Sequence, residues 1–220
     1  MTLRLGDVAP DFTCETTAGV INFHRWLAGQ WCVFFSHPKD FTPVCTTELA
    51  EMARLKPEFD KRNCKIIGLG VDSIGQHLEW SKDIEEVGGV APNYPVISDT
   101  SLEVSKLYGM LPQLAGGPAG LRTAADNATV RTVFIVGPDK TIRLMMAYPM
   151  TCGRNFAEIL RALDSLRLGE THAIGTPANW QEGDEVIIAP SVSDEAARAL
   201  YPGGWRAPKP YLRYVSKPAA

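Results

Sequence analysis

Cys45 stands in a run of residues whose types and spacing could support thiol chemistry. The aromatic and β-branched stretch 31–35 predicts a buried strand, and Pro38 and Pro43 bound the turn after it. Thr42 before Pro43 is a typical helix start, with threonine as the N-cap and proline at the first helical position. Cys45 would then lie in the first turn, where unpaired amides and the helix dipole favour an anion, so we expect its thiol to ionise readily. From these residues alone, a nucleophile and a buried structural cysteine are about equally supported.

Composition restricts the classes of protein to consider. The chain has 220 residues, 45% of them hydrophobic, which is enough for one large domain or for a domain with an appendage. A net charge of -3 gives no reason to expect a nucleic acid or an anionic membrane as partner. The five cysteines form no C-x-x-C pair and have no metal-ligand spacing to the four histidines, so we expect neither a disulfide framework nor a metal site. The start of the sequence lacks a signal-peptide pattern and no apolar run approaches ~20 residues, which predicts a cytoplasmic protein without membrane spans.

Hydrophobic periodicity predicts an α/β fold for residues 1–168. Strands and helices alternate through the first two thirds of the chain, which favours a sheet with parallel strands and helices on both faces. The predicted elements are a hairpin at 11–23, strands at 31–35, 65–72, 94–99, 129–136 and 141–148, and helices at 45–62, 76–87, 102–108 and 155–168. Residues 114–127 are rich in glycine and proline and predict a loop, either a surface insertion or, half as probable, a substrate contact.

Residues 169–220 differ in character and predict a small α+β extension. Prolines and glycines punctuate a strand at 185–189, a helix at 193–200 and a strand at 211–215. The segment is too small for a confident core of its own, yet it contains large aromatic residues, namely Trp180, Trp205, Tyr211 and Tyr214. We therefore expect the extension to pack at a homodimer interface.

The region around Cys45 resembles a known family. Pro38-x-x-x-Thr42-x-x-Cys45 resembles the active-site signature of the peroxiredoxins, and the longer run 36–49 is similar to their one-cysteine, peroxiredoxin-6-like group. Residues 6–12, 130–135, 148–149 and 153–156 extend the resemblance along nearly the whole chain. The resemblance implies a thioredoxin-like mixed sheet and a thiol peroxidase that reduces hydrogen peroxide and organic hydroperoxides without a cofactor. Cys45 would pass through a sulfenic acid, in the service of antioxidant defence and redox homeostasis.

The resemblance also implies roles for residues around the thiol. Arg131, which opens a buried strand and needs a partner there, would lie beside the thiolate and hold the peroxide. Arg154 would be a second arginine, and Glu48 the carboxylate that fixes both. Hairpin geometry brings the end of strand 141–148 back to Arg131, so we expect Cys152 and Arg154 on the active-site side.

Three residues of the turn complete the predicted site. The hydroxyl of Thr42 could point at the sulfur or at the attacked oxygen, and Pro38 could shield the thiolate. His37 could contact Cys45 and the substrate, although a packing or surface role is about as well supported.

The cysteine positions bear on how the sulfenic acid is reduced. Residues 169–220 contain no cysteine, so the usual resolving thiol of the tail is absent. The predicted helix separates Cys64 from Cys45 by about 25 Å, far beyond disulfide range. Cys152 is the one internal candidate, and we favour an external thiol instead, glutathione or a thioredoxin-like protein.

Two other functions bear on this sequence. A peroxide sensor or a chaperone-like oligomer could use the same Cys45, and the homodimer could assemble further. Some members of the family also carry a phospholipase site, but Gln30 stands where its serine would be, so we do not expect that activity here.

Overall fold

The computed structural model describes residues 3–112 and 128–216, so the predicted loop at 114–127 lies outside the described residues. The chain divides into two compact units, residues 1–156 and 157–220. The boundary predicted after residue 168 lies further along, within helix α5 (Phe156–Thr171).

A seven-stranded sheet forms the centre of the first unit, with the strand order β2-β1-β5-β4-β3-β6-β7. β3, β4 and β5 are parallel, whereas β6, β7, β1 and β2 join antiparallel, so the sheet is mixed, as predicted. The strands are β1 (Thr13–Thr16), β2 (Gly19–Asn22), β3 (Trp31–Ser36), β4 (Cys64–Gly70), β5 (Val96–Ser98), β6 (Arg131–Val136) and β7 (Ile142–Tyr148).

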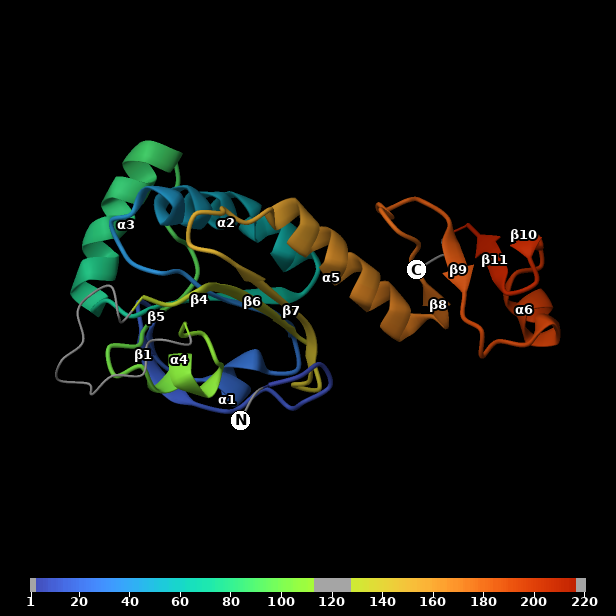
Figure 1. Ribbon diagram of the computed structural model, residues 1–220, viewed down its shortest axis with the longest axis horizontal. Coiled ribbons are helices and arrows are strands. Elements are labelled where there is room, and N and C mark those ends of the chain that lie inside the picture. The colour runs from blue at the N-terminus through green and yellow to red at the C-terminus, as the bar shows by residue number, and fades with distance from the viewer. Residues whose placement is uncertain (1–2, 113–127, 217–220) are drawn as a thin grey trace. The chain divides into compact units, whose positions relative to one another are not determined.

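Helices cover both faces of this sheet. The crossover helices α2 (Pro43–Lys61) and α3 (Ile74–Gly88) lie on one face, and the short helices α1 (Phe23–Leu27) and α4 (Glu103–Leu107) lie on the other (Figure 1). All six residues of β3 are buried. Rings from several elements pack on the face that carries α1 and α4, including those of Phe23, Phe34, Tyr108 and Phe134. The core therefore fixes β3, and with it the start of the turn that leads to α2.

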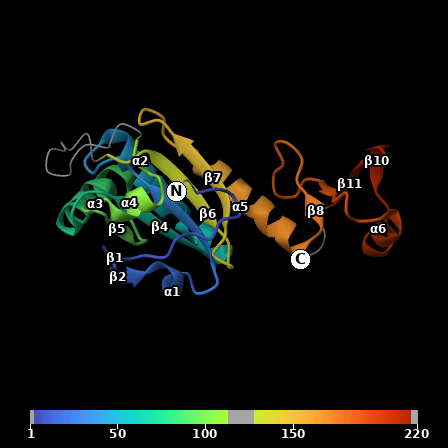
Figure 2. The same ribbon diagram turned by 60° about the horizontal axis from the view of Figure 1, so that its bottom comes forward.

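Strand register decides which residues meet at the end of β3. β6 runs antiparallel to β3, with Phe35 opposite Val133, so the start of β6 lies beside the end of β3. β7 returns antiparallel to β6 and places Tyr148 opposite Arg131, as the hairpin predicted. Cys64 pairs with Trp31 at the opposite end of β3. The view in Figure 2 shows β6 and β7 side by side along the sheet.

The second unit has its own small sheet and apolar cluster. The sheet order is β10-β11-β9-β8, built from β8 (Ile174–Gly175), β9 (Val186–Ile188), β10 (Arg206–Lys209) and β11 (Leu212–Val215), with helix α6 (Asp194–Leu200). Trp180 is only 2% exposed in a cluster with residues of α5, β9 and α6, so it does not need a second chain to cover it. The sequence did not predict β8 or β10, which are a two-residue and a four-residue strand.

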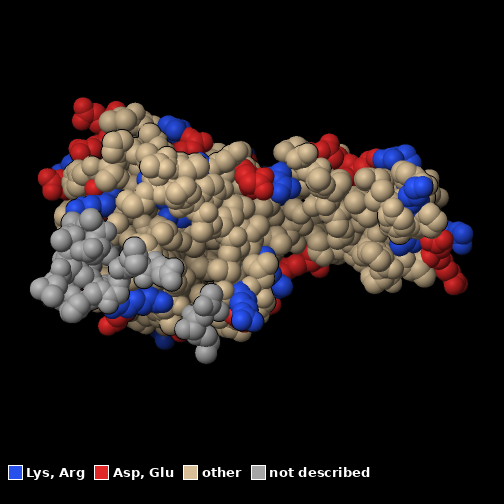
Figure 3. All heavy atoms as spheres, in the orientation of Figure 1, with Lys and Arg blue, Asp and Glu red and all other residues tan. Residues whose placement is uncertain are grey.

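Charged residues of both signs occur on the surface of the molecule. On the face seen in Figure 3, lysine and arginine residues lie interspersed with aspartate and glutamate residues. Within residues 3–112 and 128–216, no helix is long and apolar enough to cross a bilayer.

Candidate active site

Cys45 lies in the first turn of α2, as predicted, and is fully buried. Thr42 occupies the N-cap position with extended backbone angles (φ -116°, ψ 144°), but its side chain does not cap the helix. Its hydroxyl donates to the carbonyl of Lys39 at 2.9 Å instead. The helix start was therefore predicted correctly, whereas the side chain of Thr42 makes no capping hydrogen bond and its hydroxyl is turned toward the Lys39 carbonyl.

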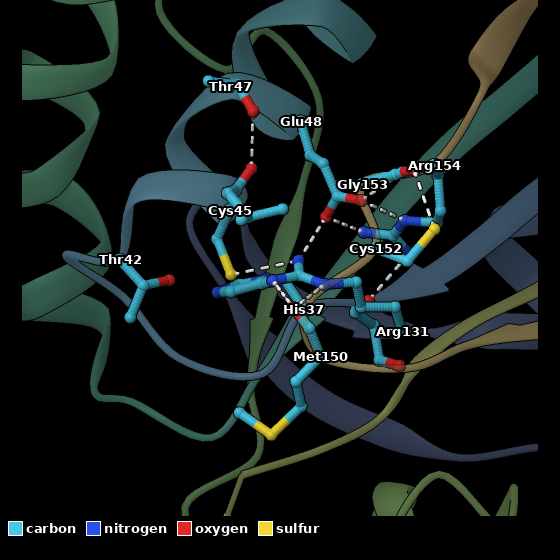
Figure 4. Close-up of polar contacts among 12 residues, drawn as sticks. His37, Thr42, Cys45, Thr47, Glu48, Arg131, Met150, Cys152, Gly153 and Arg154 are labelled. Atoms are coloured by element: carbon cyan, nitrogen blue, oxygen red, sulfur yellow. Dashed lines mark hydrogen bonds and ion pairs between the residues drawn. The ribbon is translucent and has the colours of Figure 1, made fainter.

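Arg131 contacts the sulfur directly. Its Nη1 donates to Cys45 Sγ at 3.3 Å and to Glu48 Oε2 at 2.6 Å (Figure 4). Nε and Nη2 both donate to the carbonyl of Met150, at 2.9 and 2.8 Å. The guanidinium is 3% exposed, and its hydrogen bonds to Glu48 and to the carbonyl of Met150 fix its orientation toward the sulfur.

Glu48 joins the second arginine to the first. Arg154 Nε donates to Glu48 Oε1 at 2.9 Å and Nη2 donates to Oε2 at 2.6 Å, a bidentate pair. The backbone N–H of Arg154 adds a third hydrogen bond to Oε1 at 2.8 Å. Arg154 Nη1 donates to the carbonyl of Ser36 at 2.8 Å, and its guanidinium lies over the ring of Phe35 at 5.0 Å. The end of β3 and the segment after β7 are thereby tied to one carboxylate of α2.

The charges of this buried group do not cancel. Arg131 and Arg154 are cations and Glu48 is a single anion, and all three are at most 7% exposed. Burying a surplus charge is costly unless an opposite charge compensates it. The group that Arg131 touches besides Glu48 and Met150 is the sulfur of Cys45. The surplus positive charge of the group therefore faces the sulfur.

His37 is fully buried, and the structure gives it no hydrogen bond to Cys45. Its Nε2 contacts Asp40 Oδ1 at 2.7 Å, and Asp40 Oδ2 contacts His77 Nδ1 at 2.6 Å. Burial lowers the pKa of His37, and the Asp40 carboxylate opposes that effect without cancelling it. The predicted contact of His37 with the substrate stays a prediction.

Asp40 and His77 were not singled out in the sequence. Asp40 lies in the turn before α2 and His77 in the first turn of α3, and their spacing in the sequence gives no sign that the two side chains meet. Ligand-type atoms of His37, Asp40 and His77 lie within 4.8 Å of one another, the one cluster of this kind among the described residues.

Pro38 and Cys152 lie in different environments. Pro38 is buried in the turn before Cys45. Cys152 is exposed, and its thiol contacts the carbonyl of Gly153 at 3.7 Å. In Figure 4, Glu48 and the arginines lie between the sulfurs of Cys152 and Cys45. An internal disulfide would therefore require the segment that follows β7 to move.

Two family models match the chain. Residues 5–145 match the model of the AhpC/TSA family, and residues 165–204 match the C-terminal domain of 1-Cys peroxiredoxin.

Individual relatives agree with these matches over nearly the whole length. The chain is 50% identical to a 1-Cys peroxiredoxin of Dictyostelium discoideum, covering 98% of this chain and 86% of that protein. It is 45% identical to Peroxiredoxin-6 of Rattus norvegicus, covering 98% of each.

Solved structures show the same fold. A cysteine-to-serine mutant of Peroxiredoxin 6 of Arenicola marina superposes with a TM-score of 0.89 at 42% identity, covering 99% of this chain and 100% of that one. A yeast mitochondrial 1-Cys peroxiredoxin, studied for thiol resolution through the glutathione/thioredoxin systems, gives a TM-score of 0.87 at 44% identity and covers 98% and 100%.

Proposed function

The chain belongs to the peroxiredoxin family, in its one-cysteine group, and is a thiol peroxidase, and on this premise we propose that Cys45 is the residue that peroxide oxidises. The observation that carries the proposal is the 3.3 Å contact between Arg131 Nη1 and the sulfur, in a buried group with one surplus positive charge. A thiolate is the nucleophile in such a reaction, and this surrounding stabilises it.

The first step oxidises the sulfur by two electrons. The thiolate of Cys45 attacks one oxygen of the peroxide, the O–O bond breaks, and hydroxide or alkoxide leaves and takes up a proton. Cys45 becomes a sulfenic acid. Negative charge spreads over the sulfur and both oxygens in the transition state, so donors that are already fixed lower its energy. Arg131 and the first-turn amides of α2 supply such donors.

Thr42 and Pro38 complete the proposed site. The hydroxyl proton of Thr42 is engaged by the Lys39 carbonyl at 2.9 Å, so its oxygen can accept a hydrogen bond from a bound peroxide. Pro38 is buried beside the site and offers no N–H, so it can exclude water without adding a donor. Glu48 and Arg154 act by orienting Arg131.

Two molecules of an external thiol would restore Cys45. The first attacks the sulfenic acid, which releases water and leaves a mixed disulfide, and the second releases Cys45 and forms the external disulfide. Residues 169–220 lack cysteine, and Cys64 pairs with Trp31 at the far end of β3, which supports an external reductant. The thiol-resolution study of the yeast relative supports glutathione or thioredoxin as the source.

The mass of the intact protein tests this mechanism. After one equivalent of peroxide under non-reducing conditions, one added oxygen is expected, and Cys45→Ser should remove that addition together with all peroxide consumption. Cys152→Ser should leave the first oxidation unchanged. A loss of two hydrogens that disappears in Cys152→Ser would instead establish an internal disulfide and refute the one-cysteine cycle.

Assembly and compartment belong to the same proposal. β7 is an edge strand of the sheet. Its first residue, Ile142, pairs with Gly6 and Asp7, but no further strand among the described residues pairs with the outer side of 143–148, which supports a homodimer formed through that edge. Sedimentation at micromolar concentration should show a dimer or a multiple of it, and a monomer would contradict the proposal.

No disulfide joins any two of the five cysteines, all of which lie in the described residues, and this supports a reducing compartment such as the cytoplasm. We therefore place the protein there. Fractionation that recovers it chiefly in another compartment would refute this assignment.

A further inference from the structure

The turn that delivers Cys45 adopts a backbone that needs support. Phe41, between Asp40 and Thr42, has φ 54°, a left-handed conformation that residues other than glycine seldom adopt. Its ring is about half exposed and contacts the ring of Trp80 on one side, at 6.2 Å between centroids, so its own packing holds it only in part. The neighbouring residues of the turn must therefore fix this conformation.

Asp40 is the residue through which the turn is held. Its backbone N–H donates to Asp72 Oδ2 at 2.9 Å, and its carboxylate lies between two imidazoles. Oδ1 contacts His37 Nε2 at 2.7 Å and Oδ2 contacts His77 Nδ1 at 2.6 Å, with His77 on α3. These three side chains are at most 4% exposed, so water does not compete for the contacts.

The hydrogen bonds fix where the protons lie. His77 Nε2 is 3.1 Å from the carbonyl of Ile97, which can only accept, so Nε2 carries a proton. The 2.6 Å contact between His77 Nδ1 and Asp40 Oδ2 also needs a proton, since two lone pairs would otherwise face each other. The other titratable groups around this pair are His37, Asp72 and, acting on His37, Arg154.

A metal ion does not fit these distances. Two ligands at about 2.1 Å from one ion lie roughly 3 Å apart or more, whereas the two contacts of Asp40 measure 2.6 and 2.7 Å. Both are ordinary lengths for charge-assisted hydrogen bonds. The group is a hydrogen-bonded clamp.

Gly70 leaves space beside the sheet for the two imidazole rings of the clamp. A Cβ at Gly70, the last residue of β4, would lie 2.6 Å from His37 Cε1 and 2.7 Å from His77 Cε1. Because both rings are fixed by Asp40, neither can move aside without breaking a hydrogen bond.

We propose that His77, which does not touch Cys45, is a positioning residue for the peroxidase reaction: through Asp40 it holds the turn 37–42 in the conformation that presents Cys45. A second contact from the same helix supports this role. Trp80 Nε1 donates to Thr46 Oγ1 at 3.2 Å, and Thr46 Oγ1 donates to the Thr42 carbonyl at 2.9 Å. His77 and Trp80 thus connect the start of α3 to the two neighbours of Phe41. His77 contacts Asp40, and Trp80 reaches Thr42 through Thr46. The inference rests on the proposed role of Cys45.

Two amide substitutions separate the contacts of His77. In His77→Asn, the amide nitrogen can take the place of Nδ1 and still donate to Asp40, while the contact with Ile97 is lost. In His77→Gln, the amide reaches the place of Nε2 and keeps the contact with Ile97, while that with Asp40 is lost. Glu79→Gln, at an exposed site on the same helix, is the matched control.

The measurement is the second-order rate constant for oxidation of Cys45 by hydrogen peroxide, followed by the mass of the protein, with melting temperature recorded for each variant. We expect His77→Gln to lose about 10- to 100-fold in this rate constant, the effect of a misplaced reacting group, and His77→Asn to stay near the wild type. The two variants each lose one buried hydrogen bond, so their melting temperatures should fall by similar amounts.

A His77→Gln variant as fast as the wild type, or a His77→Asn variant as slow as His77→Gln, would overturn the positioning role. Wild-type protein that forms no sulfenic acid would instead refute the proposed function itself. Hydrogen exchange of residues 37–46 should be faster in His77→Gln than in His77→Asn if the turn has been released, and equal exchange would also count against the inference.

Discussion

Replacing Arg131 with glutamine tests whether charge at the sulfur drives the reaction. Glutamine can still donate hydrogen bonds, but the buried group then contains Arg154 and Glu48 as its only charges, which cancel. A thiolate at Cys45 would then be an uncompensated buried anion. We therefore expect slower oxidation by peroxide.

The size of the effect follows from the 3.3 Å contact between Arg131 and the sulfur. Two unit charges at that separation interact by about 1 kcal/mol in bulk water and by about 5 kcal/mol at an effective dielectric constant near 20. The site is almost fully buried, which favours the upper part of this range. At about 1.4 kcal/mol for each factor of ten, the rate constant should fall roughly 100- to 1000-fold.

Stopped-flow oxidation by hydrogen peroxide and the ultraviolet absorbance of the thiolate are the assays. Arg131→Lys is the matched variant, because it keeps the charge but cannot serve the sulfur, Glu48 and Met150 together. It should retain more activity than Arg131→Gln. A glutamine variant that reacts as fast as the wild type, or no slower than the lysine variant, would refute the electrostatic reasoning.

Two further predictions concern the clamp. Gly70→Ala should destabilise the protein by about 1–3 kcal/mol through overpacking, because the new Cβ meets the rings of His37 and His77. Gly75→Ala is the control, since the nearest surrounding atom would be 4.0 Å from its Cβ. Equal melting temperatures for the two variants would contradict the close packing at Gly70. Burial lowers the pKa of His37 below its usual 6.5, so the unfolded chain binds a proton near that pH that the folded chain does not. The free energy of unfolding should therefore decrease as the pH is lowered below about 6.5 and increase as the pH is raised toward it. His37→Gln keeps a donor for Asp40 without titrating, so its melting temperature should depend less on pH in that range, and an unchanged pH dependence would count against a buried neutral His37.

Local patterns predicted most of the first unit because its elements are long and bounded by clear signals. Residues 76–87 were predicted as a helix, and α3 runs from Ile74 to Gly88 with a capping box at Ser73. The hairpin at Gly137–Lys140 fixed the return of β7 to Arg131. The short strands β8 and β10 were missed, since a few residues carry no recognisable period and these strands exist only by pairing with their neighbours.

The sequence by itself determined that Cys45 begins a helix after a buried strand, and that the start of β6 and the end of β7 lie at the same end of the sheet. Those features depend on proline geometry, apolar periodicity and turn chemistry, which act over a few residues. Only the tertiary structure decided the rest: Arg131 meets a sulfur 86 residues away, and Asp40 meets His77 at a separation of 37. Such contacts arise when the packing of the core brings distant segments together, and no local preference encodes the surplus positive charge around the sulfur.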